Sequence, residues 1–456
     1  MGDVPVDTTG QATLADLGLS NGHPLAGGVM RHDARFVLLA TAAIVGCSTA
    51  TGERAGGARL TTLFDSTGSD SVIATTAGFV DAASVRPVVE ELRIAGTRED
   101  TSLFADAFEF DVGQDGRMYV FDQPARSILI FDSAGALVRR VGRSGSGPGE
   151  FLANNGMTVL ADGRLAQWDS RNARVNFLSA DGDYLESWSV PGGFSPNNAL
   201  RTDRTGALYV MRPVTRPAAG AVIGRLGLIR LVGSGQLADS LEPPNLPFER
   251  IAYVASRGKN FAQGFSEWTP THSARFLWAW HEDGYFVSVS TGTYAIESSR
   301  PERPLRIVRD APTIPVPDDE RTNNQERITA SLQRVDPAWT WPGPPIPTTK
   351  PPVAGLFVGR DGSIWVRVAV PSVEIPELER EQARPDQPPP LRFRDAALEY
   401  EVFTGDGRFL HRIRLPWRAQ VMEADGERVW YLDRDADGLP AVVRARIPPD
   451  DSDQRY

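Results

Sequence analysis

Three aspartates near the C-terminus have the spacing that best fits a known chemistry. Asp433, Asp435 and Asp437 occupy alternate positions before a glycine, as carboxylates do in loops that bind calcium. The match then breaks down, because Ala441 and Arg444 stand at the ninth and twelfth positions, where such loops need oxygen ligands. A simple hairpin turn suits the same residues. Calcium and a plain turn both stay open, and no other cofactor is indicated.

Cys47 is the only cysteine among the 456 residues, so neither an intramolecular disulfide nor a cysteine-based metal site can form. It ends the tetrad Ile-Val-Gly-Cys at 44–47, which matches the lipobox of bacterial lipoproteins. Arg31 and Arg35 provide a basic start, and the apolar run that follows is too short to span a bilayer as a helix. We predict that Cys47 carries a lipid and anchors the protein to a membrane.

The remaining candidates for chemistry are few. His272, His281 and His411 are far apart in sequence and show no metal-ligand spacing. Trp339 and Trp341 lie close together among prolines, and rigid aromatic side chains provide much contact area for little ordering entropy. We predict that these two tryptophans bind a ligand. The alternative is that they pin their own loop to the rest of the protein.

A glycine-rich loop at 142–150 invites comparison with loops that cradle phosphates. No Lys-Ser or Lys-Thr pair follows Gly147, and Glu150 stands where a dinucleotide fingerprint would have its third glycine. The glycines and Pro148 instead favour a compact, shaped connection. Phe151 then returns to the core.

The elements that must position these residues are short strands that repeat. Gly116 and Gly163 are 47 residues apart, and so are Gly135 and Gly182, and each marks a turn between apolar strand-like runs. Repeats of forty to fifty residues with four short strands each are typical of β-propeller blades. The sequence therefore predicts an all-β fold.

Six turns of the same kind open six predicted blades. They are Asp115-Gly116, Asp162-Gly163, Thr205-Gly206, Asp283-Gly284, Asp361-Gly362 and Asp425-Gly426. An apolar run at 88–94 precedes the first blade and has no partner nearby, so we predict that it completes the last blade and closes the ring. The expected fold is a six-bladed β-propeller of four-stranded antiparallel blades, closed by an N-terminal strand, with loop and helix insertions.

Three gaps between turns are longer than a blade and indicate insertions at 212–271, 309–352 and 373–390. The second is predicted to hold a helix at 318–332, begun by Pro317 and acidic residues. Long loops grouped on one face of a rigid scaffold commonly bind ligands. We place binding specificity in the second insertion, which carries the two tryptophans.

The motif Gly-x-Gly-Pro-Gly-Glu-Phe at 145–151, with Asp122…Arg126 and Asp169…Arg174 beside it, resembles the NHL repeat. Over roughly 60–447 the chain resembles bacterial six-bladed β-propeller lipoproteins built from such repeats. The resemblance implies a fold, and a binding or scaffold module, more than a reaction. Some propellers of this kind are metal-dependent lactonases or lyases, so an enzyme with its site at the central channel is the alternative.

The net charge of −10 and the pI near 5.2 exclude the basic footprint of a nucleic-acid-binding protein. We expect a periplasm- or exterior-facing protein of the bacterial cell envelope, at the outer membrane, whose ligand is a protein, peptide or carbohydrate. The predicted organisation is an upstream extension at 1–29, a signal peptide at 30–46, a tether at 47–59, a hairpin region at 60–87, the propeller at 88–447 and an acidic tail at 448–456.

Overall fold

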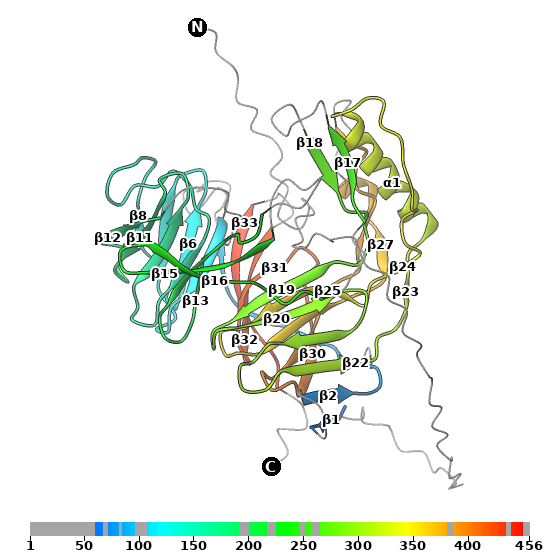
Figure 1. Ribbon diagram of the computed structural model, residues 1–456, viewed down its shortest axis with the longest axis horizontal. Coiled ribbons are helices and arrows are strands. Elements are labelled where there is room, and N and C mark those ends of the chain that lie inside the picture. The colour runs from blue at the N-terminus through cyan, green and yellow to red at the C-terminus, as the bar shows by residue number, and fades with distance from the viewer. Residues whose placement is uncertain are drawn as a thin grey trace.

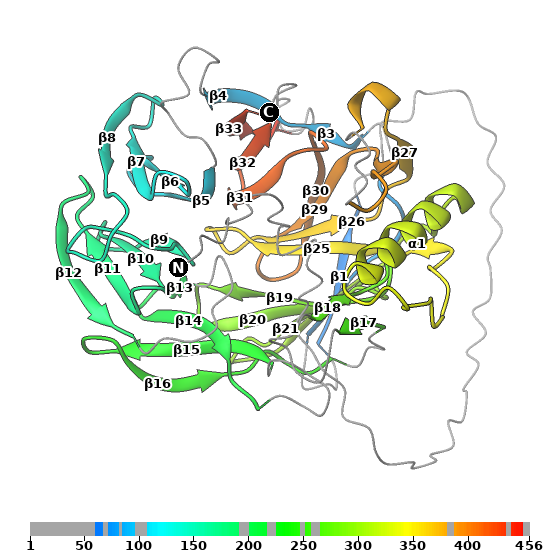
Figure 2. The ribbon, with the colours of Figure 1, turned by 90° about the horizontal axis from the view of Figure 1, so that it is seen from above.

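Six antiparallel sheets stand around a central axis in a six-bladed β-propeller (Figure 2). The computed structural model describes residues 60–66, 72–81, 84–95, 107–190, 200–216, 225–246, 251–256, 265–380, 387–434 and 439–449. In each blade the first strand lies nearest the axis and the fourth lies outermost. This confirms the predicted fold class.

The first three blades follow one another along the chain. Blade 1 consists of β5 (Ala107–Val112), β6 (Met118–Asp122), β7 (Ser127–Phe131) and β8 (Leu137–Val141); blade 2 of β9 (Met157–Val159), β10 (Leu165–Asp169), β11 (Arg174–Leu178) and β12 (Tyr184–Ser189); blade 3 of β13 (Leu200–Thr202), β14 (Leu208–Pro213), β15 (Leu226–Val232) and β16 (Gln236–Leu241).

Of the other three blades, the last takes its fourth strand from the N-terminus. Blade 4 consists of β19 (Phe276–His281), β20 (Tyr285–Ser290), β21 (Ala295–Ser298) and β22 (Leu305–Arg309); blade 5 of β25 (Val353–Val358), β26 (Ile364–Val368), β29 (Leu398–Phe403) and β30 (Phe409–Leu415); blade 6 of β31 (Gln420–Ala424), β32 (Arg428–Arg434), β33 (Pro440–Arg446) and β4 (Val89–Ala95).

The described N-terminal strands run along the outside of three successive blades. The hairpin of β1 (Thr62–Asp65) and β2 (Val72–Thr76) adds in parallel to β22, β3 (Arg86–Pro87) adds in parallel to β30, and β4 pairs antiparallel with β33. The pairing of β4 confirms ring closure by the strand predicted at 88–94. We call β1 to β4 the N-terminal belt.

Sequence and position within a blade explain each other. Middle strands such as β6 and β7 are buried at every position, because a neighbouring blade covers each face, and they are correspondingly apolar. The outer strand β8 is exposed at four of its five residues. One cluster of buried apolar side chains fills each of the six interfaces between described blades.

All six predicted turns join the first strand of a blade to the second. Gly116 and Gly163 adopt φ angles of 81° and 84°, a region that side chains with a Cβ resist. The predicted connection at 142–150 joins β8 to β9. There Arg174 donates hydrogen bonds to the carbonyls of Ser146, Gly147 and Glu150.

The insertions contain α1 (Asp318–Gln333), which confirms the helix predicted at 318–332, together with short strands. These are β17 (Tyr253–Ser256), β18 (Phe265–Trp268), β23 (Ile314–Pro315), β24 (Thr349–Lys350), β27 (Ser372–Glu374) and β28 (Phe393–Asp395), with a 3-10 turn at Glu377–Glu379. The first predicted insertion was too long, since β15 and β16 are blade strands within it. The Thr205-Gly206 turn marks this blade in sequence, but a connecting segment separates β14 from β15, so the two outer strands were assigned to the insertion.

Candidate functional site

The three insertions leave the propeller on the same face. Strands alternate in direction within a blade, so the loops joining second to third strands and fourth strands to the next blade share one face. The first two insertions, 242–275 and 310–352, join successive blades, and the third, 369–397, joins β26 to β29. We call this side the insertion face and the opposite side, with the Asp-Gly turns, the turn face.

The insertions pack on one another to form what we call the insertion module. Tyr253 of β17 and Leu332 of α1 share a buried apolar cluster with Trp339. The Asn323 side chain of α1 donates to the carbonyl of Pro390 in the third insertion and accepts from Arg392 N. Figure 1 shows α1 beside the β17–β18 hairpin, and Figure 2 shows it between that hairpin and β27.

Both predicted binding tryptophans belong to this module. The Trp339 side chain is 8% exposed and its indole N–H donates to the carbonyl of Val254. Trp341 is half-buried, and its N–H donates to Pro344 O. The burial of Trp339 favours the loop-anchoring alternative for that side chain, while a binding role for Trp341 stays a prediction.

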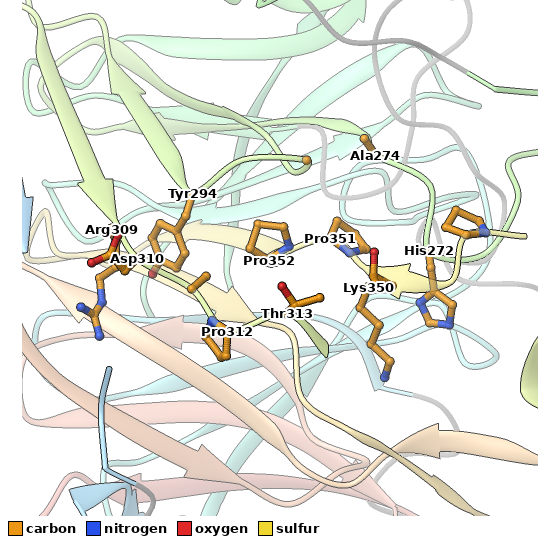
Figure 3. Close-up of a pocket in the computed structure, with 14 residues that line it drawn as sticks. His272, Ala274, Tyr294, Arg309, Asp310, Pro312, Thr313, Lys350, Pro351 and Pro352 are labelled. Carbon is orange, nitrogen blue, oxygen red and sulfur yellow. The ribbon is translucent and has the colours of Figure 1, made fainter. Parts of the chain in front are cut away.

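A pocket of about 530 Å³ opens beside the module, at the junction of blades 4 and 5 (Figure 3). His272 and Ala274 precede β19, Tyr294 precedes β21, and the segments 309–313 and 347–352 begin and end the second insertion. Four of the 14 lining residues are prolines: Pro312, Pro347, Pro351 and Pro352. Every segment of the wall comes from blade 4 or an insertion.

A buried ion-pair network supports the pocket wall. The Arg309 guanidinium forms two hydrogen bonds with the Glu401 carboxylate, at 2.7 and 3.1 Å, and two more with the carbonyls of Thr76 and Gly78. Tyr294 Oη donates to Glu401 Oε2 at 2.7 Å. Burial, followed by the Glu401 charge, raises the pKa of Tyr294 well above its ordinary value. The belt and two blades are thus tied together under the pocket.

A second ion pair holds the other cation of the wall. Lys350 Nζ donates to Asp395 Oδ1 at 2.6 Å and to Val370 O at 2.8 Å. Burial by itself would raise the pKa of Asp395, but the charges and hydrogen bonds of Lys350 and Arg367 bring it below the ordinary value. Asp395 is therefore ionised at neutral pH, and its negative charge lies 2.6 Å from Lys350 Nζ.

His272 is the pocket residue with an unusual backbone, since its φ is 67°. Residues other than glycine adopt this region at an energetic cost and do so most often at functional sites. Its Nε2 lies 2.8 Å from Glu320 Oε1 of α1. Burial opposes ionisation of Glu320, but the His272 hydrogen bond lowers its pKa. The pair joins the end of the first insertion to the second.

A different group of charged residues lies on the innermost strands, around the central axis and towards the turn face, and we call these the channel residues. Asp111 of β5 accepts hydrogen bonds from Val112 N at 2.7 Å and Val159 N at 2.6 Å. Burial raises its pKa in spite of these bonds. Burial and then the Asp111 charge raise the pKa of Glu423, on β31, to about 8. Arg201 of β13 interacts electrostatically with both carboxyls.

The other predicted site residues are only partly described. Asp433 of β32 forms an ion pair with Arg93 of the belt at 2.9 Å, while Asp435, Asp437 and Cys47 lie outside the described residues. Within the described ranges no three His, Cys, Asp or Glu side chains are grouped to hold a metal ion. Nor does any helix there have the length and apolarity needed to cross a membrane.

Sequence reasoning missed the channel carboxyls and the role of His272. Asp111 and Glu423 are more than 300 positions apart, and each stands alone in an ordinary strand. Their common place at the end of a first strand, just before an Asp-Gly turn, is the signal that could have paired them. No local pattern links His272 to Glu320, because their contact depends on how two insertions pack.

A family model described as a six-bladed β-propeller, DUF5128, matches residues 112–219. No curated protein sequence matches the chain. Similar solved structures include a member of the DUF4221 family from Bacteroides vulgatus (10% identity, covering 80% of this chain and 99% of that one, TM-score 0.46). They also include a gluconolactonase from Xanthomonas campestris (13%, 79% and 98%, 0.36) and virginiamycin B lyase from Staphylococcus aureus (10%, 77% and 98%, 0.35). Likenesses this distant carry no argument about activity.

Proposed function

We propose that the protein is an extracytoplasmic binding module, held at a membrane by a lipid on Cys47, which captures its ligand in the pocket between blades 4 and 5. One observation carries the proposal: three insertions from separate places in the chain converge into a single module beside that pocket. Concave sites at the junction of structural units are the usual places for ligands. The lipobox at 44–47 supports the anchor and the extracytoplasmic location.

Capture at the pocket is tested with a blocking substitution. Thr313 is exposed and lines the pocket, so Thr313→Trp fills space without disturbing a buried contact. The matched control is Val138→Trp on β8, an outer strand of blade 1, where Val138 is 52% exposed. From solubilised membranes the wild-type and Val138→Trp chains should retain the same partner and Thr313→Trp should lose it. Equal capture of the partner by both variants would show that the partner does not bind in this pocket.

The anchor has its own test. Lipidation requires the cysteine sulfur, so Cys47→Ser should abolish incorporation of a labelled fatty acid and release the protein from the membrane fraction. Ser48→Ala, which keeps the sulfur, should behave as wild type. Continued labelling of Cys47→Ser would contradict the lipoprotein assignment and leave the pocket experiment untouched.

Acid–base catalysis in the channel is a second candidate, favoured by Glu423. A carboxyl group with a pKa near 8 holds a proton at neutral pH and can donate it. The described residues do not fit a bound metal ion, so no step is derived through one. With a panel of simple lactones, wild-type turnover that falls in Glu423→Gln but not in Glu186→Gln would support this function. Absence of turnover in the wild type would count against it.

A further inference from the structure

The pocket between blades 4 and 5 is lined by two cations, and most of their hydrogen-bond donors are already used. Arg309 donates four N–H groups to Glu401, Thr76 O and Gly78 O. Lys350 donates two to Asp395 and Val370 O. Figure 3 shows both side chains at the edge of the pocket. Tyr294 directs its hydroxyl hydrogen to Glu401. These three residues therefore have little left to offer an anion.

The rest of the lining is rich in acceptors. The four prolines have no N–H, which lowers the number of backbone donors around the cavity. Pro312, Pro347 and Pro351 each add a carbonyl acceptor, whereas the carbonyl of Pro352 already accepts from Ala369 N at 3.1 Å. Asp310 is exposed and adds a carboxylate, engaged only by Gly78 N at 3.3 Å among the hydrogen bonds of the described residues. The hydroxyls of Thr313 and Thr349 can either donate or accept.

His272 adds a further acceptor. An ionised carboxylate can only accept a hydrogen bond, so its contact with Glu320 places the imidazole hydrogen on Nε2. In its neutral form the ring presents the Nδ1 lone pair on the other side. His272 is one of the residues that line the pocket.

We infer that this pocket binds an organic ammonium ion, with Asp310 as its counter-charge and the proline carbonyls and His272 Nδ1 as acceptors for its N–H groups. An ammonium group has three donors and no acceptor, which complements a wall short of donors. The inference rests on the proposed binding function and names the chemical class of its ligand.

Two matched pairs of probes test the inference on the full chain in non-ionic detergent. Glucosamine is compared with glucose, and 1,4-diaminobutane with 1,4-butanediol, by isothermal titration calorimetry at low salt. At least one ammonium compound should bind about tenfold more tightly than its neutral partner. The difference should shrink in 0.5 M salt, which screens charge. Equal affinities within both pairs, or tighter binding of glucuronate than of glucosamine, would overturn the inference.

Variants assign the effect to the pocket. Asp310→Asn keeps the shape and removes the charge, and should reduce the preference for the ammonium compound to about threefold or less. Asp239→Asn removes an exposed carboxylate from the outer strand of blade 3 and should leave the preference unchanged. An equal loss in both variants would mean a general effect of net charge and would sink the inference. If Thr313→Trp loses the partner but the wild-type chain shows no preference for ammonium compounds, the inference about the ligand is wrong. The proposed binding function would still stand.

Discussion

At the scale of single residues, Trp339 and Trp341 differ in what holds them. Trp339 is buried against Tyr253, with ring centroids 6.2 Å apart, and its N–H has a backbone acceptor. Trp341 contacts the same tyrosine at 4.4 Å but is half-buried. Two neighbouring tryptophans that look equivalent in sequence therefore have different surroundings.

We predict that Trp339→Ala destabilises the insertion module by about 3–5 kcal/mol, the usual range for emptying a buried aromatic site. Trp341→Ala should be milder, at about 1–2 kcal/mol, because less of its side chain is removed from water. Limited proteolysis of the second insertion and thermal melting measure both effects. Similar resistance of the Trp339→Ala and wild-type chains would show that the module does not depend on this side chain.

Glu423 should make stability depend on pH. Its pKa is about 8 in the folded protein, against an ordinary value of 4.5. The folded state therefore binds more protons than the unfolded chain between these values, and stability falls as pH rises through that window. Below about pH 4.5 both states are protonated and the effect is absent.

Glu423→Gln cannot ionise, so its melting temperature should lie close to wild type at pH 5 and above it at pH 8.5. We expect a difference on the order of 4–5 kcal/mol at the higher pH, the free energy that corresponds to a pKa shift from 4.5 to about 8. The control Glu186→Gln, at an exposed site on β12, should follow the wild-type curve. A constant offset between Glu423→Gln and wild type across the whole range would argue against a raised pKa.

At the scale of elements, the interface between blades 3 and 4 has the smallest apolar cluster of the six. It consists of four buried residues, Tyr209, Leu228, Trp280 and Phe286. The Trp280 ring lies 5.0 Å from Tyr209 and 5.1 Å from Phe286, and its N–H donates to Thr202 O of blade 3. Much of this interface depends on one side chain.

Trp280→Ala should therefore lower stability by about 3–5 kcal/mol and open the ring between blades 3 and 4. Hydrogen exchange should then speed up on β14 and β20, the strands that face each other there, more than on β6 and β10. A uniform increase over all blades would instead indicate a general loss of stability without a local seam.

Deleting part of the belt tests the predicted ring closure directly. A chain beginning at residue 96 lacks β4, so the edge of β33 is exposed. It also lacks Glu91, which forms ion pairs with Arg428 and Arg444. It should aggregate or melt well below a chain beginning at residue 48. Equal melting temperatures for these two chains would remove the support for closure.

A chain beginning at residue 85 keeps β3 and β4, and therefore keeps the closed ring. It lacks β2, which covers the edge of β22, and it lacks the carbonyls of Thr76 and Gly78, which accept hydrogen bonds from Arg309. We expect intermediate stability for this chain, measured in the same melting series. Buried arginines that lose such acceptors destabilise a fold strongly.

At the scale of the whole molecule, regular features could be predicted from sequence and convergent ones could not. Turn glycines and apolar strands carry a local signal, so the six blades, the closing strand and α1 were all predictable. The pocket and the channel bring together residues from different blades and insertions, such as His272 with Glu320. Such contacts arise only when complete elements pack together, so no spacing of residues along the chain predicts them.

The belt also imposes an order on folding. Blade 1 is made of neighbours in sequence and can form early, whereas Arg93 of the belt meets Asp433 across 340 positions and Phe409 N meets Thr62 across 347. Contacts of such separation form slowly, because a very long loop must close first. During synthesis the belt emerges first, and its partner strands β22, β30 and β33 emerge only later.

Pulse-labelled hydrogen exchange during refolding should accordingly protect the amides of β6 and β7 before those of β2 and β4. Simultaneous protection would mean that the ring forms in one step. For a chain exported as we propose, the belt crosses the membrane first, and the ring can close only after the last blade has followed it.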